Sequence, residues 1–385
     1  MKRVAVVGIG QTKFDEHWEK SLRQLSTEAG AKALMDAKIS GKDIQALYMG
    51  NMSAGRFVGQ DHLGALAVDE AGLNPIPATR VEAACASGAL AFRNACFSIM
   101  SGQHDIVIAA GAEKMTDIKG TDAIATLMGA GDQEWESSIG LTFTGLYALM
   151  ARTHMKQFGT TQEQLAMVSV NNHKNGSKNP LAQYPYEITV DQVMKSSMIA
   201  DPLKLLDCSP ITDGAAAIIL VSEELAKNFE NPIWLLGTGQ ASDTLALHDR
   251  KSLTEMLATK VAARKAYAQS GLSHEGIDIA EVHDCFSINE IIAIEDLGFV
   301  EKGKGGRFVE EGNVAIDGEK PVNTTGGLKS IGHPVGATGI RQIVDITKQL
   351  RGQAGLLQVR SANTGLALNV GGSGATSIVN IFGKE

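Results

Sequence analysis

The stretches VEAACASGALAFR (residues 81–93) and KSIGHPVGATGIR (residues 329–341) carry the pattern that decides the fold. GALAFR in the first and GATGIR in the second share their opening Gly-Ala and their closing arginine. Each is followed by a helical stretch that ends in Gly-Gln. A match of this kind indicates an internal repeat when other segments match in the same order.

Two further pairs of segments match in that order. One pair is GIGQ (residues 8–11) and GTGQ (residues 237–240). The other is AKALMDAKISGKDIQALYMG (residues 31–50) and RKAYAQSGLSHEGIDIAEVH (residues 264–283), which both read as a helix, a Gly/Ser turn and a strand. Three matches in register predict two homologous α/β halves.

The repeat predicts how the chain is divided. The first half comprises residues 1–115 together with 207–230, and the second half comprises residues 231–385. Residues 116–206 have no counterpart in the second half and are richer in Met, Gln, Asn, Lys and His. We predict that they form an inserted loop domain that folds over the active site.

Short strand-like runs alternate with helical patterns along the chain, which is typical of α/β layering. Several of these runs are apolar throughout, as strands buried on both faces of a sheet should be. The predicted strands are residues 4–10, 44–50, 105–111, 216–222, 233–239, 279–284, 356–360 and 376–381. The predicted fold class is therefore α/β.

The bulk composition is that of a globular enzyme. Of the 385 residues, 44% are apolar and 20% are charged. The formal net charge of −8 argues against a nucleic-acid surface, which needs clustered Lys and Arg. Four cysteines without a C-x-x-C pair favour a reducing compartment over a disulfide framework. Because no apolar run has the length of a signal or membrane segment, we expect a soluble cytoplasmic protein.

The repeat places a cysteine and a histidine at equivalent positions. Cys85 lies three residues before GALAFR, and His333 lies three residues before GATGIR. Two halves related by a pseudo-twofold axis would bring these positions together, each at the N-terminus of a core helix. The partial positive charge of a helix N-terminus stabilises a thiolate and disfavours imidazolium. We therefore expect Cys85 to be a nucleophile and His333 to be a neutral base.

Two other clusters are interpreted as parts of the same site. HDCF (residues 283–286) ends a predicted strand, and α/β folds assemble their sites at the carboxyl ends of strands. His283 can donate a hydrogen bond to a carbonyl oxygen, and Cys285 can carry a proton. These two residues alone make a weak case for a metal site, so we predict none. The glycines of NVGGSGA (residues 369–375) would let backbone N–H groups approach a ligand and form an oxyanion hole.

These motifs resemble those of the thiolase superfamily. The matching stretches are CASGALA from Cys85 onward, HDCF at 283–286, GGLKSIGHPVGATGIRQ at 326–342 and SPITDGAAAIILVSE at 209–223. The resemblance covers nearly the whole chain, and the HDCF form points to the sterol-carrier-protein-2-like and archaeal branch. It implies the thiolase fold, in which two pseudo-symmetric α/β halves hold central helices between mixed sheets and carry an inserted loop domain.

The resemblance implies a role for each site residue. Cys85 would be the acylated nucleophile, and His333 would activate it and help bind the substrate thioester oxygen. His283 stands where many thiolases have the Asn of an NEAF motif and would support the first oxyanion hole. The backbone N–H groups of Cys85 and Gly371 would form the second. Coenzyme A thioesters are the implied substrates, and no tightly bound cofactor is implied.

One departure from the family pattern changes the expected mechanism. Many thiolases carry a second catalytic cysteine in a C-x-G-G-G motif, and Asn369 occupies that position here. In the HDCF branch the acid/base thiol comes from the other loop, which would be Cys285. The implied reaction is a reversible Claisen condensation. Cys85 is acetylated, Cys285 removes an α-proton from a second acetyl-CoA, and the carbanion attacks acetyl-Cys85 to give acetoacetyl-CoA.

The resemblance also implies partners, and two alternatives stay open. It implies a homodimer or tetramer and an association with HMG-CoA synthase and a zinc-ribbon/OB-fold (DUF35-type) protein, without nucleic acid or membrane. One alternative is another condensing enzyme of the same superfold, such as a β-ketoacyl synthase, which lacks a thiol acid/base like Cys285. The other is a non-catalytic thiolase-like scaffold subunit, in which Cys85 would be unreactive.

Overall fold

The computed structural model describes residues 2–384, and its main feature is a nine-stranded mixed sheet. The strands are β1 (Val4–Gln11), β2 (Ala46–Gly50), β3 (Ala78–Val81), β4 (Ile106–Glu113), β5 (Met198–Ala200), β6 (Leu203–Lys204), β7 (Gly214–Ser222), β8 (Ile233–Ser242), β9 (Ile279–Glu281), β10 (Thr364–Gly371) and β11 (Thr376–Gly383). Of these, β5 and β6 pair only with each other.

Helices flank the sheet on both faces. They are α1 (Leu22–Ala37), α2 (Ala54–Phe57), α3 (Leu63–Glu70), α4 (Ser87–Met100), α5 (Gly120–Leu127), α6 (Phe143–Phe158), α7 (Gln162–Gly176), α8 (Val190–Lys195), α9 (Glu223–Ala226), α10 (Leu257–Ser270), α11 (Ser287–Asp296), α12 (Gly305–Glu310), α13 (Gly327–Ile331) and α14 (Thr338–Arg351). No helix within residues 2–384 combines the length and the apolar character that a membrane crossing requires.

Seven of the eight predicted strands are present, with ends that differ by at most three residues. The predicted strand at 356–360 is wrong, because a short 3-10 turn (Gly355–Leu357) begins this connection. Gly355 and Ser361, on either side of this segment, have positive φ angles of 57° and 55°, so a turn lies at each of its ends. The sequence patterns miss the edge strand β3 and also β10, because the glycines of 369–375 suggest a loop. Residues 369–371 are instead the end of buried β10.

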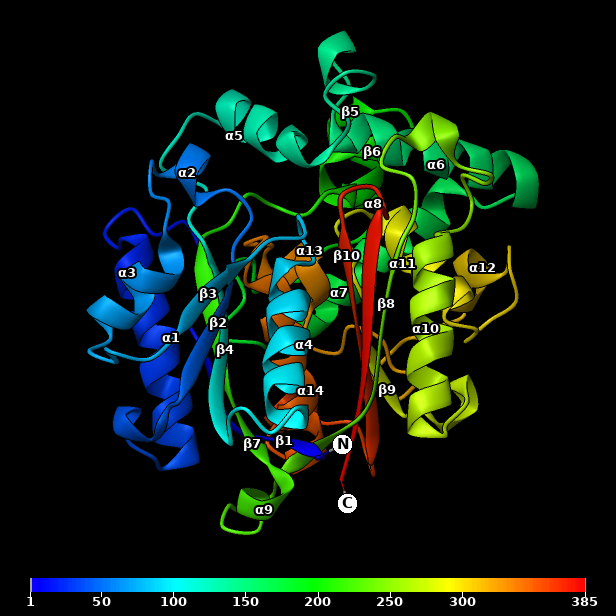
Figure 1. The fold of residues 1–385 in the computed structure, drawn as a ribbon. Coiled ribbons are helices and arrows are strands. Elements are labelled where there is room, and N and C mark those ends of the chain that lie inside the picture. The colour runs from blue at the N-terminus through cyan, green and yellow to red at the C-terminus, as the bar shows by residue number, and fades with distance from the viewer. Residues whose placement is uncertain (1, 385) are drawn as a thin grey trace.

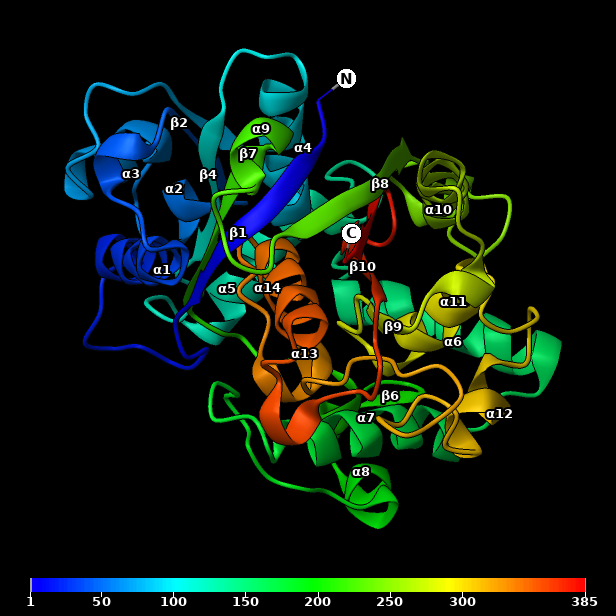
Figure 2. The same cartoon turned by 90° about the horizontal axis from the view of Figure 1, so that it is seen from below.

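The topology of the sheet repeats on either side of its centre. The strand order is β3-β2-β4-β7-β1-β8-β11-β10-β9. From the centre outward, β1-β7-β4-β2 corresponds to β8-β11-β10-β9, and in both runs two antiparallel pairings are followed by a parallel one. The two arms meet where β1 pairs with β8 through only two residue pairs (Figure 2). This equivalence supports our proposal of two homologous halves, 1–115 with 207–230 and 231–385, with residues 116–206 inserted.

The helices and the two arms of the sheet form layers (Figure 1). α1 packs against β1 and β7 on the outside of one arm, and α10 packs against β8 and β11 on the outside of the other. α4 and α14 lie next to each other between the arms. Phe92 of α4 packs against Phe382 of β11 with ring centroids 5.5 Å apart, which joins the central layer to the second arm. Burial of such a side chain stabilises the fold by about 1.5–3 kcal/mol.

Glycines allow the first turns of α4 and α14 to touch each other and the strands beside them. A Cβ at Gly111 of β4 would lie 2.2 Å from the carbonyl oxygen of Gly336, which precedes α14. A Cβ at Gly88 of α4 would lie 2.8 Å from the same oxygen. At the end of β2, a Cβ at Gly50 would lie 2.6 Å from the carbonyl oxygen of Ser87. This close approach brings together the residues that precede the two central helices.

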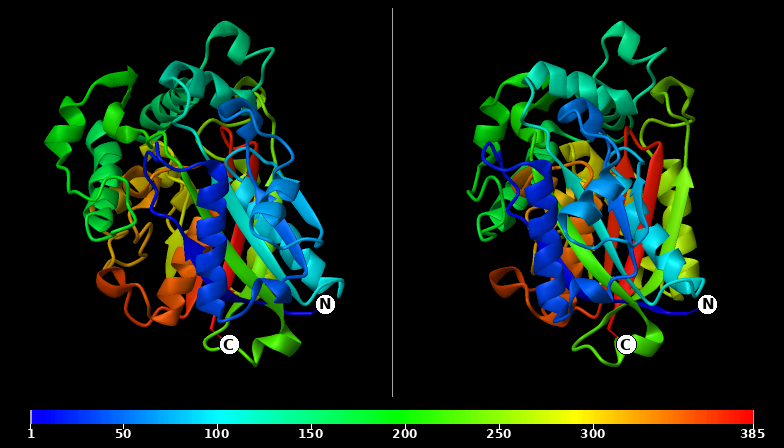
Figure 3. Two further views of the ribbon diagram at one scale, coloured as in Figure 1. Left: turned by 90° about the vertical axis from the view of Figure 1, so that its left-hand side faces the viewer. Right: turned by 60° about the vertical axis from the view of Figure 1, so that its left-hand side comes forward.

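The inserted segment covers one end of the sheet, and the two chain ends lie at the other (Figure 3). α5, α6 and the β5–β6 pair lie above the central helices in the view of Figure 1. Two contacts anchor α6 to the second half. His154 lies 3.1 Å from Glu295 of α11, and the ring of Tyr147 packs on Phe286 with centroids 4.7 Å apart.

We predict that Gly111→Ala lowers the free energy of unfolding by about 2 kcal/mol or more, because the added methyl group pushes against the backbone before α14. Thermal unfolding followed by circular dichroism would show a lower Tm. Gly120→Ala is the matched control, since a Cβ at that helix start would meet no atom of residues 2–384 within 4 Å apart from its chain neighbours and its own helix backbone. Its Tm should stay the same or rise slightly. An unchanged Tm for Gly111→Ala would contradict the close contact.

Candidate active site

Cys85 lies on a tight turn between β3 and α4. Ala84 has a positive φ of 51°, a backbone conformation that is strained for any residue with a Cβ. The Ser87 hydroxyl holds this turn, because it donates to the carbonyl oxygen of Ala84 at 2.6 Å and accepts from the N–H of Ala83 at 2.9 Å. The thiol of Cys85 is thereby placed two residues before α4, where it remains partly accessible.

The surroundings of Cys85 favour the neutral thiol. Burial raises its pKa to about 12, and the carboxyl group of Glu113 acts in the same direction. The N–H groups of Gly372 and of Cys85 itself lower the pKa but do not cancel the shift. The expectation that the helix N-terminus favours a thiolate is therefore wrong, because removing the anion from water outweighs that field. A base must take the proton before the sulfur can attack.

His333 precedes α14 and has one free ring nitrogen. Its Nδ1 is 2.6 Å from the hydroxyl of Thr338, which itself donates to the carbonyl oxygen of Pro334 at 3.1 Å. A hydroxyl has one proton, so Thr338 accepts from the Nδ1–H and leaves a lone pair on Nε2. Nε2 is buried and has no hydrogen-bond partner within residues 2–384. Burial, with Arg341 nearby, lowers the pKa of His333 to about 3, so the ring is neutral as expected, through burial rather than the helix terminus.

Cys85, His283 and His333 converge at one place. The Sγ of Cys85 and one ring nitrogen of each histidine all lie within 4.8 Å of one another. The two rings meet edge to face, with centroids 4.9 Å apart and planes at 82°. Burial and the neighbouring His333 hold the pKa of His283 well below its ordinary value. The three atoms are also close enough for a metal ion to bridge them, and the same closeness serves a nucleophile and its base.

Cys285 lines the same cavity as Cys85. Burial raises the pKa of its thiol, and the nearby Cys85 adds to that shift. The hydroxyl of Tyr147 contacts the Cys285 thiol and donates to the carbonyl oxygen of Gly372 at 3.0 Å. Tyr147 belongs to the inserted segment, and sequence reasoning misses it because a buried tyrosine in a helix ordinarily reads as core.

The cavity has a volume of about 270 Å³ and mostly apolar walls. Both halves of the fold contribute to it, and the inserted segment supplies Ile124, Leu127, Phe143, Ile199 and Leu205. Walls of this kind lower the polarity around the sulfur and strengthen the electrostatic interactions inside, although Ile124, Ile199 and Leu205 are about half exposed. The prediction that the inserted residues fold over the site thus gains support from their side chains.

The backbone N–H that faces Cys85 belongs to Gly372. Sequence reasoning expects Gly371 to form the second oxyanion hole with Cys85. In the structure Gly372 lines the cavity and presents its N–H to the sulfur, whereas Gly371 packs against the carbonyl oxygen of Ala83. Gly372 has a φ of 62°, and this turn after β10 directs its N–H toward the thiol. The geometry therefore favours Gly372 over Gly371.

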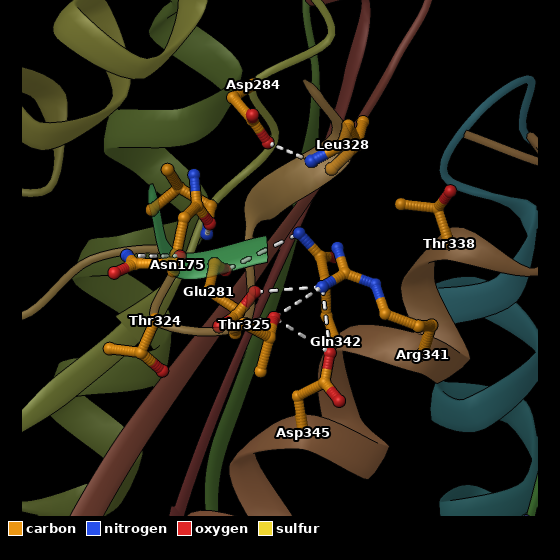
Figure 4. A network of polar contacts seen from close by, with 12 residues as sticks. Asn175, Glu281, Asp284, Thr324, Thr325, Leu328, Thr338, Arg341, Gln342 and Asp345 are labelled. Atoms are coloured by element: carbon orange, nitrogen blue, oxygen red, sulfur yellow. Dashed lines mark hydrogen bonds and ion pairs between the residues drawn. The ribbon is translucent and has the colours of Figure 1, made fainter. Parts of the chain in front are cut away.

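A buried network of charged residues fixes the HDCF segment (Figure 4). Arg341 of α14 binds the carboxylates of Glu281 at 2.9 Å and Asp345 at 2.8 Å. Asp284 accepts hydrogen bonds from two N–H groups in the first turn of α13, at 2.7 and 3.2 Å. Because Glu281 and Asp284 flank His283 in the chain, these contacts hold His283 between α13 and α14.

We predict that His333→Asn makes stability less sensitive to acid. The pKa of His333 is about 3 in the folded protein and 6.5 ordinarily, so the unfolded chain binds an extra proton between these values. Its contribution to stability is fully present above about pH 6.5 and is lost as the pH falls toward about 3. Between about pH 7 and pH 5 the Tm of His333→Asn should therefore fall less than that of the wild type. Equal falls would contradict the buried, neutral state.

Comparisons with known sequences identify related proteins. Residues 4–224 match the family model described as "Thiolase, N-terminal domain", and residues 239–384 match "Thiolase C-terminal domain-like". Acetyl-CoA acetyltransferases of Methanothermobacter thermautotrophicus and Methanocaldococcus jannaschii are 57% and 51% identical, over 100% of this chain and of each relative. Sterol carrier protein 2 of Bos taurus is 36% identical over 98% of this chain and 71% of that protein.

Solved structures agree as well. The "Ltp2-ChsH2(DUF35) aldolase" has a TM-score of 0.86 at 26% identity, covering 99% of this chain and 98% of that one. Human mitochondrial 3-ketoacyl-CoA thiolase in complex with CoA shares the fold, with a TM-score of 0.77 at 19% identity, covering 100% of this chain and 98% of that one. With a family model matched along each half and relatives matched over the full length, the chain belongs to the thiolase family.

Proposed function

We propose that this protein is an acetyl-CoA acetyltransferase that condenses two molecules of acetyl-CoA to acetoacetyl-CoA and coenzyme A, and that catalyses the reverse thiolysis. The observation that carries the proposal is the convergence of Cys85, His283 and His333 within 4.8 Å beside an apolar cavity of about 270 Å³. Two relatives named acetyl-CoA acetyltransferase, matched over the whole length of the chain, support the substrate.

In the first step Cys85 is acetylated. Nε2 of His333 takes the thiol proton as the sulfur of Cys85 attacks the thioester carbonyl. A carbon–sulfur bond to Cys85 forms, and the bond to the coenzyme A sulfur breaks. Cys285 gives its proton to the departing thiolate, so coenzyme A leaves as a thiol. The raised pKa of the Cys285 thiol supports this role, because the group holds a proton at rest.

In the second step a carbon–carbon bond forms. The Cys285 thiolate removes an α-proton from a second acetyl-CoA, and the carbanion attacks the carbonyl carbon of acetyl-Cys85. The bond from that carbon to the Cys85 sulfur breaks, and the sulfur regains its proton from His333. All groups then return to their starting protonation states. A thiolate in surroundings that raise the thiol pKa is a strong base, which suits removal of a carbon-bound proton.

Two oxyanions need hydrogen-bond donors in this scheme. The N–H groups of Cys85 and Gly372 are the proposed donors to the acetyl-Cys85 carbonyl oxygen. His283 and the protonated His333 are the proposed donors to the thioester oxygen of the second acetyl-CoA. Each donor should contribute about 10²-fold to 10³-fold in rate, because it acts in a cavity with mostly apolar walls.

We also propose that the chain acts as a homodimer or tetramer and together with a DUF35-type partner. The structure named "Ltp2-ChsH2(DUF35) aldolase" covers 99% of this chain with a TM-score of 0.86, which supports such a partner. A zinc-ribbon/OB-fold protein of this type and an HMG-CoA synthase are the partners that the family resemblance implies.

We predict that Cys285→Ala slows condensation and thiolysis by about 10²-fold to 10⁴-fold, because alanine cannot carry the proton. The decrease in acetoacetyl-CoA absorbance measures thiolysis directly. Cys96→Ala is the matched control, since Cys96 is buried in α4, outside the residues that line the cavity, and has no role in the scheme. It should keep the wild-type rate.

Two outcomes would contradict the proposal, each in favour of a different alternative. Thiolysis by Cys285→Ala at the wild-type rate would favour a condensing enzyme with one cysteine. A Cys85 that iodoacetamide does not alkylate, with or without acetyl-CoA, would favour a non-catalytic scaffold. In the proposed enzyme iodoacetamide alkylates Cys85, and acetyl-CoA protects it.

A further inference from the structure

Asn369 and His283 are in direct contact. Ala367 of β10 pairs with Glu281, the last residue of parallel β9. Residue 369 lies two positions further along β10, and residue 283 lies two positions beyond the end of β9. The side-chain nitrogen of Asn369 lies 3.1 Å from Nδ1 of His283. Both side chains are fully buried, so this contact decides the state of that ring nitrogen.

The orientation of the Asn369 amide follows from its surroundings. Its oxygen packs against Gly339 in the first turn of α14, where a Cβ would lie 2.3 Å from that oxygen. The same Cβ would lie 2.3 Å from the backbone nitrogen of Ala89, in the first turn of α4. Within residues 2–384 no group donates a hydrogen bond to this oxygen, so its placement rests on the partial positive charge of the free N–H groups at the two helix starts. The amide NH₂ therefore faces His283.

An amide NH₂ can only donate a hydrogen bond, so Nδ1 of His283 accepts and carries no proton. The single proton of the neutral ring is then on Nε2, the nitrogen left to face Cys85 and His333. We propose that Asn369 is a positioning residue that holds His283 as the Nε2–H tautomer, a hydrogen-bond donor to the substrate thioester oxygen. The inference rests on the proposed function, which brings a thioester to His283.

The neighbouring ring is held in the opposite tautomer. Thr338 accepts from Nδ1–H of His333, which leaves a lone pair on Nε2. The two ring centroids are 4.9 Å apart and both residues are buried, so burial alone does not give the rings different roles. The group in contact with Nδ1 of each ring determines its role. Asn369 makes His283 a donor, and Thr338 makes His333 an acceptor.

Asn369→Leu tests the inference, because leucine is similar in size and cannot donate. We expect condensation to slow by about 10-fold to 10²-fold, since a ring that is no longer held loses most of what an oxyanion donor contributes. Acetylation of Cys85 by acetyl-CoA, followed by rapid quenching and mass spectrometry, should stay within about twofold of the wild type. That step uses His333 and backbone N–H groups and does not need His283.

Thr338→Val is the matched control for the other ring. It removes the partner of His333 and should therefore slow the acetylation of Cys85, the step that Asn369→Leu spares. Thr338→Ser keeps the hydroxyl and should restore acetylation. Equal effects of Thr338→Val and Asn369→Leu on both steps would indicate general damage to the site and would overturn the inference.

His283→Ala separates this inference from the proposed function. Asn369→Leu should cause no further loss in the His283→Ala background, because Asn369 acts through that ring. Nitrogen-15 NMR of histidine-labelled protein should show His283 with an unprotonated Nδ1 and a protonated Nε2. A protonated Nδ1, or the same loss from Asn369→Leu in both backgrounds, overturns the inference. Condensation at the wild-type rate by His283→Ala would instead overturn the proposed role of His283 itself.

Discussion

The contact between the first turns of α4 and α14 is the constraint on which the rest of the structure depends. Gly88, Gly111 and Gly336 leave the backbone room to approach until a carbonyl oxygen occupies the space of a missing Cβ. Cys85 and His333 precede these two turns, so the packing of the central layer sets the distance between nucleophile and base. The two arms of the sheet, which meet at β1 and β8, hold the helices in this position (Figure 2).

Burial then governs the chemistry of the residues that this contact brings together. It favours the neutral forms of Cys85, Cys285, His283 and His333, and so disfavours a thiolate–imidazolium pair among them before substrate binds. Charge develops only as protons move during the reaction, and fixed N–H donors are then most effective. Arg341 and its carboxylate partners lie outside this neutral cluster and fix the backbone that carries His283 (Figure 4).

The sequence predicts the pairing of Cys85 with His333 because symmetry alone makes equivalent positions meet. It also predicts most strands, since a fully buried strand is an unbroken apolar run. The sequence does not predict properties of the site that depend on how side chains are oriented or on how much of a group is buried. The prediction of a thiolate at Cys85 is wrong because desolvation raises the thiol pKa more than the nearby N–H groups lower it. The turn after β10 makes the N–H of Gly372, and not that of Gly371, face the sulfur. Tyr147, Thr338 and Asn369 act through contacts that no spacing pattern contains.

The central claim is that Cys85 is the residue that carries the acyl group. Peptide mass spectrometry after brief incubation of the full chain with acetyl-CoA tests it most directly. The account predicts an acetyl group on the peptide that contains Cys85, none on the peptides of the other three cysteines, and release of one coenzyme A for each group transferred. Acetylation at another residue, or release of coenzyme A without modification of Cys85, would contradict the account.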